Sequence, residues 1–226
     1  MSGFKRINVA TAMEETGLVP LFYHPDPLVC KEVIAACHAG GARVFEFTNR
    51  GDFAHEVFAE VRKWALKELP AMMIGAGSIP DAPTAALFMQ TGADFIVSPS
   101  LNPEVARICN RRKVLWIAGC GTVTEISQAE ELGAEIVKIF PGSAVGGPSF
   151  VKDVKGPCPW TSIMPTGGVE PTEENLSGWF AAGVTCVGMG SALVKERIVR
   201  EANWKSLEAV VRETLNIIKK IRPATT

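Results

Sequence analysis

The stretch ARVFEFTNRGDFAHEVFAEVRKWALKEL (residues 42–69) contains one complete structural unit of this protein. It begins with an apolar run rich in Val and Phe, passes through a polar turn, and ends in a segment whose apolar residues recur at helical spacing. The run predicts a β-strand over 42–49, and the second pattern predicts an α-helix over 53–69. The unit is therefore a strand followed by a helix.

The same unit recurs along the chain. Apolar runs return about every 20 to 25 residues, each followed by a polar or glycine turn and a helical pattern. Strict alternation implies parallel strands joined by right-handed crossovers. Eight repeats in 226 residues predict an α/β fold: a single (β/α)8 TIM barrel domain over 1–226 with an extra N-terminal helix over about 3–16. A doubly wound open sheet is the alternative. The predicted strands span 17–24, 42–49, 72–78, 93–100, 114–120, 135–142, 161–168 and 184–190.

Composition and charge narrow the class of partner. Hydrophobic residues make up 47% of the chain, and 23 basic against 24 acidic residues leave no broad positive field for nucleic acid or an anionic membrane. The six cysteines are scattered without a C-x-x-C pair, which favours a reducing compartment. The first residues lack the apolar stretch of a signal peptide. We therefore expect a cytoplasmic protein that binds a small molecule, with no nucleic-acid or membrane partner.

Two of the eight predicted strands contain a charged residue near the middle or in the later half. Parallel strands covered on both faces read as continuous apolar runs, so Glu46 in the second strand and Lys138 in the sixth stand out. Period two places Glu46 on the face opposite Phe45 and Phe47, whose rings suit the layer beneath the helices. We expect Glu46 and Lys138 to face the barrel axis toward its carboxyl-terminal mouth, where such barrels bind substrate.

This pair has a structural and a functional interpretation. As a buried ion pair it would add little stability, because desolvation of two charges offsets their attraction. As a catalytic pair it would use a lysine amine freed by burial: an ordinary lysine is unprotonated in only about one molecule in two thousand at pH 7. Attack of the amine on a ketone gives an imine that acts as an electron sink, while Glu46 moves protons. The sequence thus predicts Schiff-base chemistry at Lys138, with no metal or cofactor.

Two anion sites are predicted near this pair. Arg50, in the loop after the second strand, is either a solvated surface residue or a bidentate contact for a substrate carboxylate. PTGG (165–168) ends the seventh strand, and GMGSA (188–192) ends the eighth and opens a short helix. Loops at these two positions of a barrel often bind phosphate through backbone N–H groups, which glycine lets approach closely. Each stretch could also be a tight turn, but together they predict a phosphate site.

Other chemistries find little support. HEVFA (55–59) begins like a zinc-protease motif but lacks the second histidine, no G-x-S-x-G elbow is present, and the glycine turns lack the third glycine of a dinucleotide fingerprint. His24 is interpreted as a rim histidine that could contact substrate, and nothing near Cys120 suggests an activated thiolate. Three aspartates are interpreted as capping residues of helices and strands: Asp52, Asp81 and Asp94.

These residues together resemble the 2-keto-3-deoxy-6-phosphogluconate (KDPG) aldolase family, including members that cleave 4-hydroxy-2-oxoglutarate (KHG). The resemblance covers about residues 10–200, in the same order along the chain. The motifs that carry it are GARVFEFTNR (41–50), GAGS (75–78), ADFIVSPS (93–100), GTVTE (121–125), VKIFP (137–141), PTGGV (165–169) and GMGSAL (188–193).

The resemblance implies a class I aldolase, usually a homotrimer, that cleaves KDPG to pyruvate and glyceraldehyde 3-phosphate in the Entner–Doudoroff pathway. Some members of the family also cleave KHG to pyruvate and glyoxylate. Lys138 matches the Schiff-base lysine, Glu46 the general acid and base, and Arg50 the contact for the pyruvate carboxylate. The remaining implied substrate-binding residues are Ser78, Thr166 and the phosphate-contacting Gly167, Gly168, Gly190 and Ser191.

Three features depart from the expected family pattern. Ser78 stands where a threonine is common, and AGCGT (118–122) and FPGSAVGG (140–147) replace the usual loop sequences. These positions bear on specificity for the aldehyde fragment, so an aldolase for the galactonate epimer stays an alternative. So do a phosphate-binding barrel isomerase or decarboxylase that uses Lys138 only as a charge, and a non-catalytic sugar-phosphate sensor.

Overall fold

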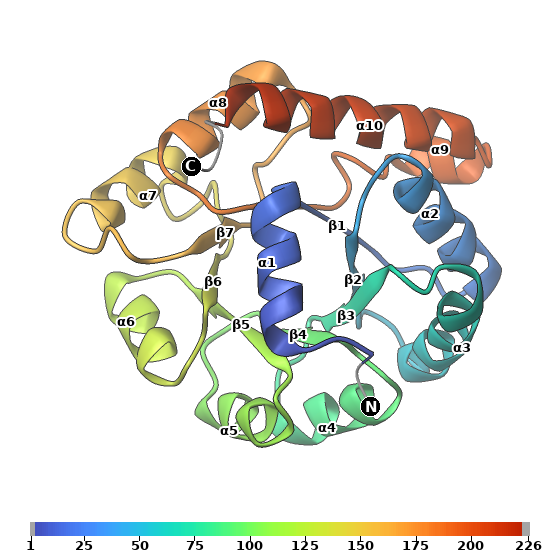
Figure 1. Cartoon of the computed structure of the whole chain (residues 1–226), viewed down its shortest axis with the longest axis horizontal. Coiled ribbons are helices and arrows are strands. Elements are labelled where there is room, and N and C mark those ends of the chain that lie inside the picture. Colours follow the sequence, from blue (N-terminus) through green and yellow to red (C-terminus); the bar gives the residue numbers. More distant parts are fainter. Residues whose placement is uncertain (1–2, 223–226) are drawn as a thin grey trace.

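Eight parallel strands form the inner wall of the protein in residues 3–222, the part of the chain described by the computed structural model. Neighbouring strands pair in the order β7-β6-β5-β4-β3-β2-β1-β8, and the helices lie outside them (Figure 1). The predicted barrel is thus confirmed, and the open sheet is excluded. The strands are β1 (Leu18–Phe22), β2 (Val44–Thr48), β3 (Met73–Gly77), β4 (Phe95–Val97), β5 (Leu115–Cys120), β6 (Ile136–Ile139), β7 (Ile163–Pro165) and β8 (Val187–Met189).

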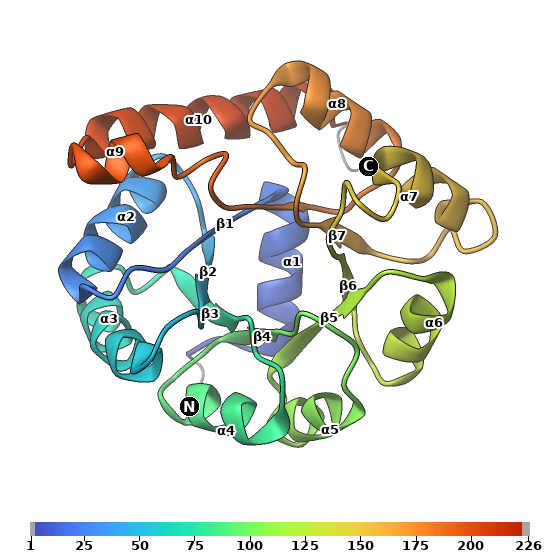
Figure 2. The same ribbon diagram turned by 180° about the vertical axis from the view of Figure 1, so that it is seen from behind.

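The helices follow the strands in the expected alternation, and α10 lies along the outside of the ring beside α2 and α8 (Figures 1 and 2). None of those described has the length and apolar character needed to cross a bilayer. The helices are α1 (Arg6–Thr16), α2 (Pro27–Ala39), α3 (Ala54–Glu68), α4 (Ala82–Gln90), α5 (Pro103–Arg112), α6 (Val123–Glu131), α7 (Gly147–Lys155), α8 (Glu173–Ala181), α9 (Glu196–Arg200) and α10 (Trp204–Ile221).

The barrel closes between β7 and β8 through few contacts. Thr166 and Gly188 form an isolated parallel bridge, and the N–H of Thr185 donates to the carbonyl of Ile163 at 2.9 Å. A Cβ atom at Gly188 would come within 2.3 Å of Thr166 Oγ1. Glycine at this position therefore lets the last strand approach the seventh.

Alternate residues of each strand face two separate apolar layers. Phe45, Phe47 and Val137 pack in the outer layer against the helices, whereas Val44 and Ile136 belong to the cluster inside the barrel. Because side chains alternate along a strand, Glu46 and Lys138 point inward with Val44 and Ile136. The predicted orientation of both charged residues is confirmed.

Helix α1 covers the amino-terminal end of the barrel (Figure 1). Val9, Ala12 and Met13 are fully buried and join the inner cluster of strand residues. Arg6 fixes the start of the helix by pairing with Glu135, at the beginning of β6. The opposite, carboxyl-terminal end, seen in Figure 2, is formed by the loops that follow the strands.

The predicted roles of the aspartates are only partly correct. Asp81 accepts a hydrogen bond from the N–H of Thr84 and caps α4, as expected. Asp94 is instead a buried ion-pair partner of Arg62, at 2.8 Å, and also accepts the N–H of Ile74. The Arg62–Asp94 pair was not predicted, because nothing in the sequence shows that an arginine in an amphipathic helix is buried.

Candidate active site

Lys138 and Glu46 meet inside the barrel from strands on different sides of the wall. Lys138 Nζ lies 3.8 Å from Glu46 Oε1, and the side chains are 7% and 1% exposed. Ladder pairing fixes their positions: Glu46 stands beside Leu21 and Gly75, and Lys138 beside Met164 and Gly119. The two groups predicted to act together are therefore in contact.

A glycine at position 77 leaves room for the Glu46 carboxylate. A Cβ atom added to Gly77 would lie only 1.8 Å from Glu46 Oε1, so the carboxylate occupies the space directly over that glycine. On the other side, the Lys138 ammonium lies 5.0 Å from the centre of the Phe140 ring. The acid and the amine are thus held by backbone and ring contacts as well as by each other.

Two buried polar atoms beside the pair have no hydrogen-bond partner within the described part of the chain, Glu46 Oε2 and Thr166 Oγ1. An unpaired buried polar group is unfavourable, and in native proteins such groups often belong to functional sites. Both atoms suit the hydroxyl and carbonyl groups of a small polar ligand.

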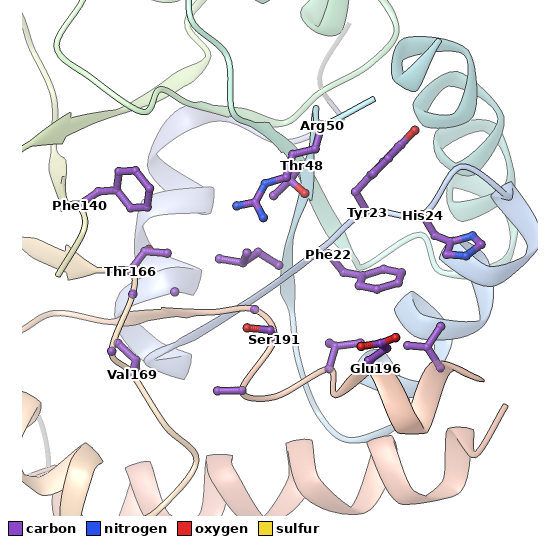
Figure 3. A pocket seen from close by; sticks show the side chains of 18 of the residues that line it. Phe22, Tyr23, His24, Thr48, Arg50, Phe140, Thr166, Val169, Ser191 and Glu196 are labelled. Carbon is purple, nitrogen blue, oxygen red and sulfur yellow. The ribbon is translucent and has the colours of Figure 1, made fainter. Parts of the chain in front are cut away.

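A cavity of about 770 Å³ opens above the pair at the carboxyl-terminal mouth (Figure 3). Lys138 and Glu46 do not line it directly, but each is two residues from a lining residue on its own face, Phe140 and Thr48 respectively. The pair therefore lies one layer below the cavity floor. The lining residues include Leu21, Phe22, Tyr23, His24, Thr48, Arg50, Phe140, Thr166, Gly167, Gly168, Val169, Gly188, Gly190, Ser191, Val194, Glu196, Val199 and Arg200.

Arg50 projects over this cavity from the loop after β2 (Figure 3). The aromatic ring of Tyr23 packs against the same loop, since a Cβ atom at Gly51 would come within 2.5 Å of Tyr23 Oη. Arg50 forms no ion pair or hydrogen bond within residues 3–222. Its guanidinium group is thus available to a ligand carboxylate.

The glycine stretches after β7 and β8 form one wall of the cavity. Gly167 and Gly168 have φ angles of 93° and 78°, a region that favours glycine. The loop after β6 supports them, because the N–H groups of Gly142 and Ser143 donate to the carbonyls of Thr166 and Gly167 at 2.8 and 3.0 Å. The predicted phosphate-site residues Gly167, Gly168, Gly190 and Ser191 all line the cavity.

Ser78, the remaining predicted site residue, directly follows Gly77, the glycine that lies against the Glu46 carboxylate. It follows β3 in a left-handed conformation, with φ of 59°, and is not among the residues that line the cavity. Cys120 is buried at the end of β5, and desolvation raises the pKa of its thiol to about 12, so it is not a thiolate nucleophile near neutral pH.

Several lining residues were missed by sequence reasoning. Thr48 shares the inward face with Glu46 and could have been found from period two alone. No such signal marks the last residue of β1, Phe22, or the residues in and just before α9, Val194, Glu196 and Val199. Their place at the cavity depends on how the closed barrel brings β1 and α9 together. In residues 3–222 no group of three His, Cys, Asp or Glu side chains is arranged to hold a metal ion.

Comparison with known proteins gives a consistent result. The family model described as KDPG and KHG aldolase matches residues 9–210. The chain is 32% identical over 179 residues to a 2-dehydro-3-deoxy-phosphogluconate aldolase of Haemophilus influenzae, covering 79% of this chain and 82% of that one. It is 31% identical over 212 residues to the enzyme of the same name from Pseudomonas aeruginosa, covering 93% of both chains.

The fold is shared with a solved KDPG aldolase from Legionella pneumophila, in which pyruvate is captured as a covalent carbinolamine intermediate. The TM-score is 0.82 at 24% identity, over 91% of this chain and 97% of the other. At that identity the likeness concerns the fold alone. Taken with the family match over most of the sequence, these findings show that the chain belongs to the KDPG and KHG aldolase family.

Proposed function

We propose that this protein is a class I aldolase that cleaves KDPG to pyruvate and glyceraldehyde 3-phosphate, and that it also cleaves KHG to pyruvate and glyoxylate. Family membership supports the reaction class. The observation that carries the proposal is the 3.8 Å contact between Lys138 Nζ and Glu46 Oε1 beneath an open cavity. An amine with a neighbouring carboxylate is the minimum that imine chemistry requires.

The reaction proceeds through an imine on Lys138. The amine adds to the C2 ketone, and the resulting carbinolamine loses water to give a protonated imine. Loss of the C4 hydroxyl proton then breaks the C3–C4 bond: the aldehyde leaves, the bonding electron pair forms the C2–C3 double bond, and the protonated imine becomes a neutral enamine. Protonation at C3 and addition of water release pyruvate and restore the amine. Glu46 carries the protons in these steps, since it is the carboxylate in contact with Lys138.

Two sets of residues bind the two anionic ends of the substrate, the carboxylate and the phosphate. Arg50 holds the carboxylate next to the ketone, and Thr166 donates its hydroxyl near the reacting carbons. Backbone groups of Gly167, Gly168, Gly190 and Ser191 hold the phosphate, an arrangement supported by their shared place on one cavity wall. Ser78 follows Gly77 at the end of β3 and binds substrate from the edge of the site.

Chemical trapping tests the proposal. Borohydride added with pyruvate is expected to attach one reduced pyruvate to Lys138, found by mass spectrometry of the digested protein, and activity is expected to survive a chelator. Lys138→Arg keeps the charge but cannot form an imine, so turnover is expected to fall at least about a thousandfold. Turnover retained by Lys138→Arg would instead support an isomerase or decarboxylase that uses Lys138 only as a charge.

A coupled assay with lactate dehydrogenase identifies the substrate. The gluconate-type acid, its galactonate epimer and KHG are each offered to the protein, and pyruvate formation is followed. We expect the highest kcat/KM with the phosphorylated gluconate-type acid. Binding of sugar phosphates without any pyruvate release would favour a sensor.

We further propose that the protein works in the cytoplasm as a homotrimer, as its relatives' family implies. Seven exposed large apolar side chains of the described region are available for subunit contacts: Ile7, Leu28, Phe53, Leu66, Leu87, Val123 and Trp160. Light scattering after size exclusion is expected to give three times the chain mass of 24.2 kDa.

A further inference from the structure

Thr48 lies between two residues of the proposed mechanism along the chain. Glu46 precedes it by two residues on the inward face of β2, and Arg50 follows it by two residues in the loop after the strand. Thr48 and Arg50 both line the cavity (Figure 3). The reaction described above gives Thr48 no role.

The pairing of β2 with β3 places Thr48 at the level of the reacting amine. Thr48 pairs with Gly77, and a Cβ atom on Gly77 would lie 1.8 Å from Glu46 Oε1. That oxygen is 3.8 Å from Lys138 Nζ. Because neighbouring strands are only about 4.8 Å apart, the inward side chain of Thr48 lies close to the Glu46 carboxylate. Substrate atoms next to a ketone carbon bonded to Nζ therefore come within reach of Thr48.

The Thr48 hydroxyl has no partner of its own. Thr48 is 2% exposed, and its hydroxyl forms no hydrogen bond within residues 3–222. By contrast, the buried Thr214 in α10 donates its hydroxyl to the carbonyl of Val210 at 2.7 Å. An unpaired hydroxyl in a buried position is unfavourable, and at a cavity wall a ligand can supply the missing partner. Thr48 thus offers an unused donor to whatever binds above Lys138.

We propose that Thr48 is a substrate-binding residue whose hydroxyl donates a hydrogen bond to the substrate carboxylate that Arg50 also holds. The carboxylate carbon is bonded to C2, the carbon that the Lys138 amine attacks, so the carboxylate lies between the amine and Arg50. A carboxylate has more acceptor sites than a guanidinium group fills, and Thr48 supplies a further donor from the strand. This inference rests on the proposed aldolase function.

Two substitutions separate the hydroxyl of Thr48 from its methyl group. Thr48→Val keeps the shape and removes the donor, whereas Thr48→Ser keeps the donor and removes the methyl group. Pyruvate and KDPG carry the same carboxylate, so we expect the same effect on both. In Thr48→Val the KM is expected to rise about tenfold for both, as for one lost hydrogen bond to a charged group, with kcat within about threefold of wild type. Thr48→Ser is expected to stay within about threefold of wild type in KM.

The two reactions are measured separately. Exchange of the pyruvate methyl hydrogens with deuterium oxide, followed by NMR, gives the KM for pyruvate, and the coupled assay with lactate dehydrogenase gives the KM for KDPG. Thr161→Val is the matched control, because Thr161 is fully buried and its Oγ1 also lacks a partner in the described chain, but it does not line the cavity. Its KM values are expected to match wild type.

Stability distinguishes substrate binding from a structural role. Replacing an unpaired buried hydroxyl by a methyl group removes an unfavourable group, so the urea midpoint of Thr48→Val without ligand is expected to equal or exceed that of wild type, as in Thr161→Val. A lowered midpoint in Thr48→Val together with the rise in KM would show a structural role and overturn the inference.

Three kinetic results would also overturn it: an unchanged KM for pyruvate in Thr48→Val, a rise in KM for KDPG alone, or a rise in Thr48→Ser as large as in Thr48→Val. The second would place Thr48 against the aldehyde fragment, and the third would assign the effect to the methyl group. If wild type itself neither exchanges pyruvate nor cleaves KDPG, the proposed function fails instead.

Discussion

At the scale of single residues, Glu46 depends on a neighbour that has no side chain. Gly77 pairs with Thr48 across the β2–β3 ladder. Glu46 lies two residues before Thr48 on the same face of β2, so its carboxylate extends over Gly77. A Cβ atom at Gly77 would lie 1.8 Å from Glu46 Oε1, far closer than any real contact between these atoms. The GAGS motif therefore acts through Glu46: its last glycine sets how the acid reaches Lys138.

Gly77→Ala is expected to lower kcat about a hundredfold with little change in KM, because it displaces Glu46, the proposed general acid and base, but leaves the proposed phosphate-binding wall intact. Shortening the acid should relieve the overlap, so Gly77→Ala with Glu46→Asp is expected to be more active than Gly77→Ala alone. Steady-state kinetics on the four members of this cycle measure the coupling. Gly178→Ala, whose nearest contact would be at 3.8 Å, is the control. A double variant no better than the product of the single effects would contradict this account.

Sequence reasoning located Lys138 and Glu46 because charge inside an apolar strand is conspicuous. It could not locate Glu196 or Arg200 at the cavity, because helix α9 is brought to it only by barrel closure. Local pattern reveals which face of a strand a residue occupies, whereas the path of a loop depends on its distant neighbours.

At the scale of elements, helix α6 begins with a reciprocal cap. Thr122 Oγ1 accepts the N–H of Glu125 at 3.2 Å, and Glu125 Oε2 accepts the N–H of Gly121 at 2.9 Å. The backbone N–H of Gly121, followed by the Thr122 hydroxyl, holds the pKa of Glu125 below its ordinary value. This cap ties the end of β5 to the helix that follows it.

Since the folded pKa of Glu125 is depressed, the stabilisation by its ionised form is fully present above the unfolded value of about 4.3 and is lost as pH falls through the folded pKa. Glu125→Gln is therefore expected to reduce the free energy of unfolding near pH 7, with the difference from wild type shrinking below about pH 4. Urea unfolding from pH 7 to pH 3 measures it. A difference that stays constant over this range would contradict the assignment.

Strand positions followed from the sequence, but strand lengths did not. The apolar run over 93–100 contains only the three-residue strand β4, and the run over 161–168 only β7. Strand ends are set by where the neighbouring strand stops pairing, and the tilt of a barrel staggers those points. Beyond them, Ser98 stays buried in loop conformation and Thr166 stays buried in an isolated bridge, so burial alone overstates the length of the strand.

At the scale of the whole molecule, the (β/α)8 barrel and its extra amino-terminal helix were predictable because both depend on repeated local patterns. The helix was expected over about 3–16 and is observed over Arg6–Thr16. Its role in closing the barrel was not predictable, since Val9, Ala12 and Met13 read in sequence as an ordinary apolar face. A surface for subunit contacts was not predictable from the sequence either, because the exposed apolar residues come from separate parts of the chain.

Helix α1 covers one end of the barrel, and within residues 3–222 the cavity above Lys138 opens at the opposite, carboxyl-terminal end, so both products leave through the same mouth. In the proposed mechanism pyruvate stays bound to Lys138 after bond cleavage, while the aldehyde lies nearer the mouth, so the aldehyde leaves first. Pyruvate is accordingly expected to compete with KDPG for the free enzyme, and glyceraldehyde 3-phosphate to inhibit noncompetitively, in initial-rate product-inhibition plots. The reverse pattern would mean that the two fragments have separate ways out.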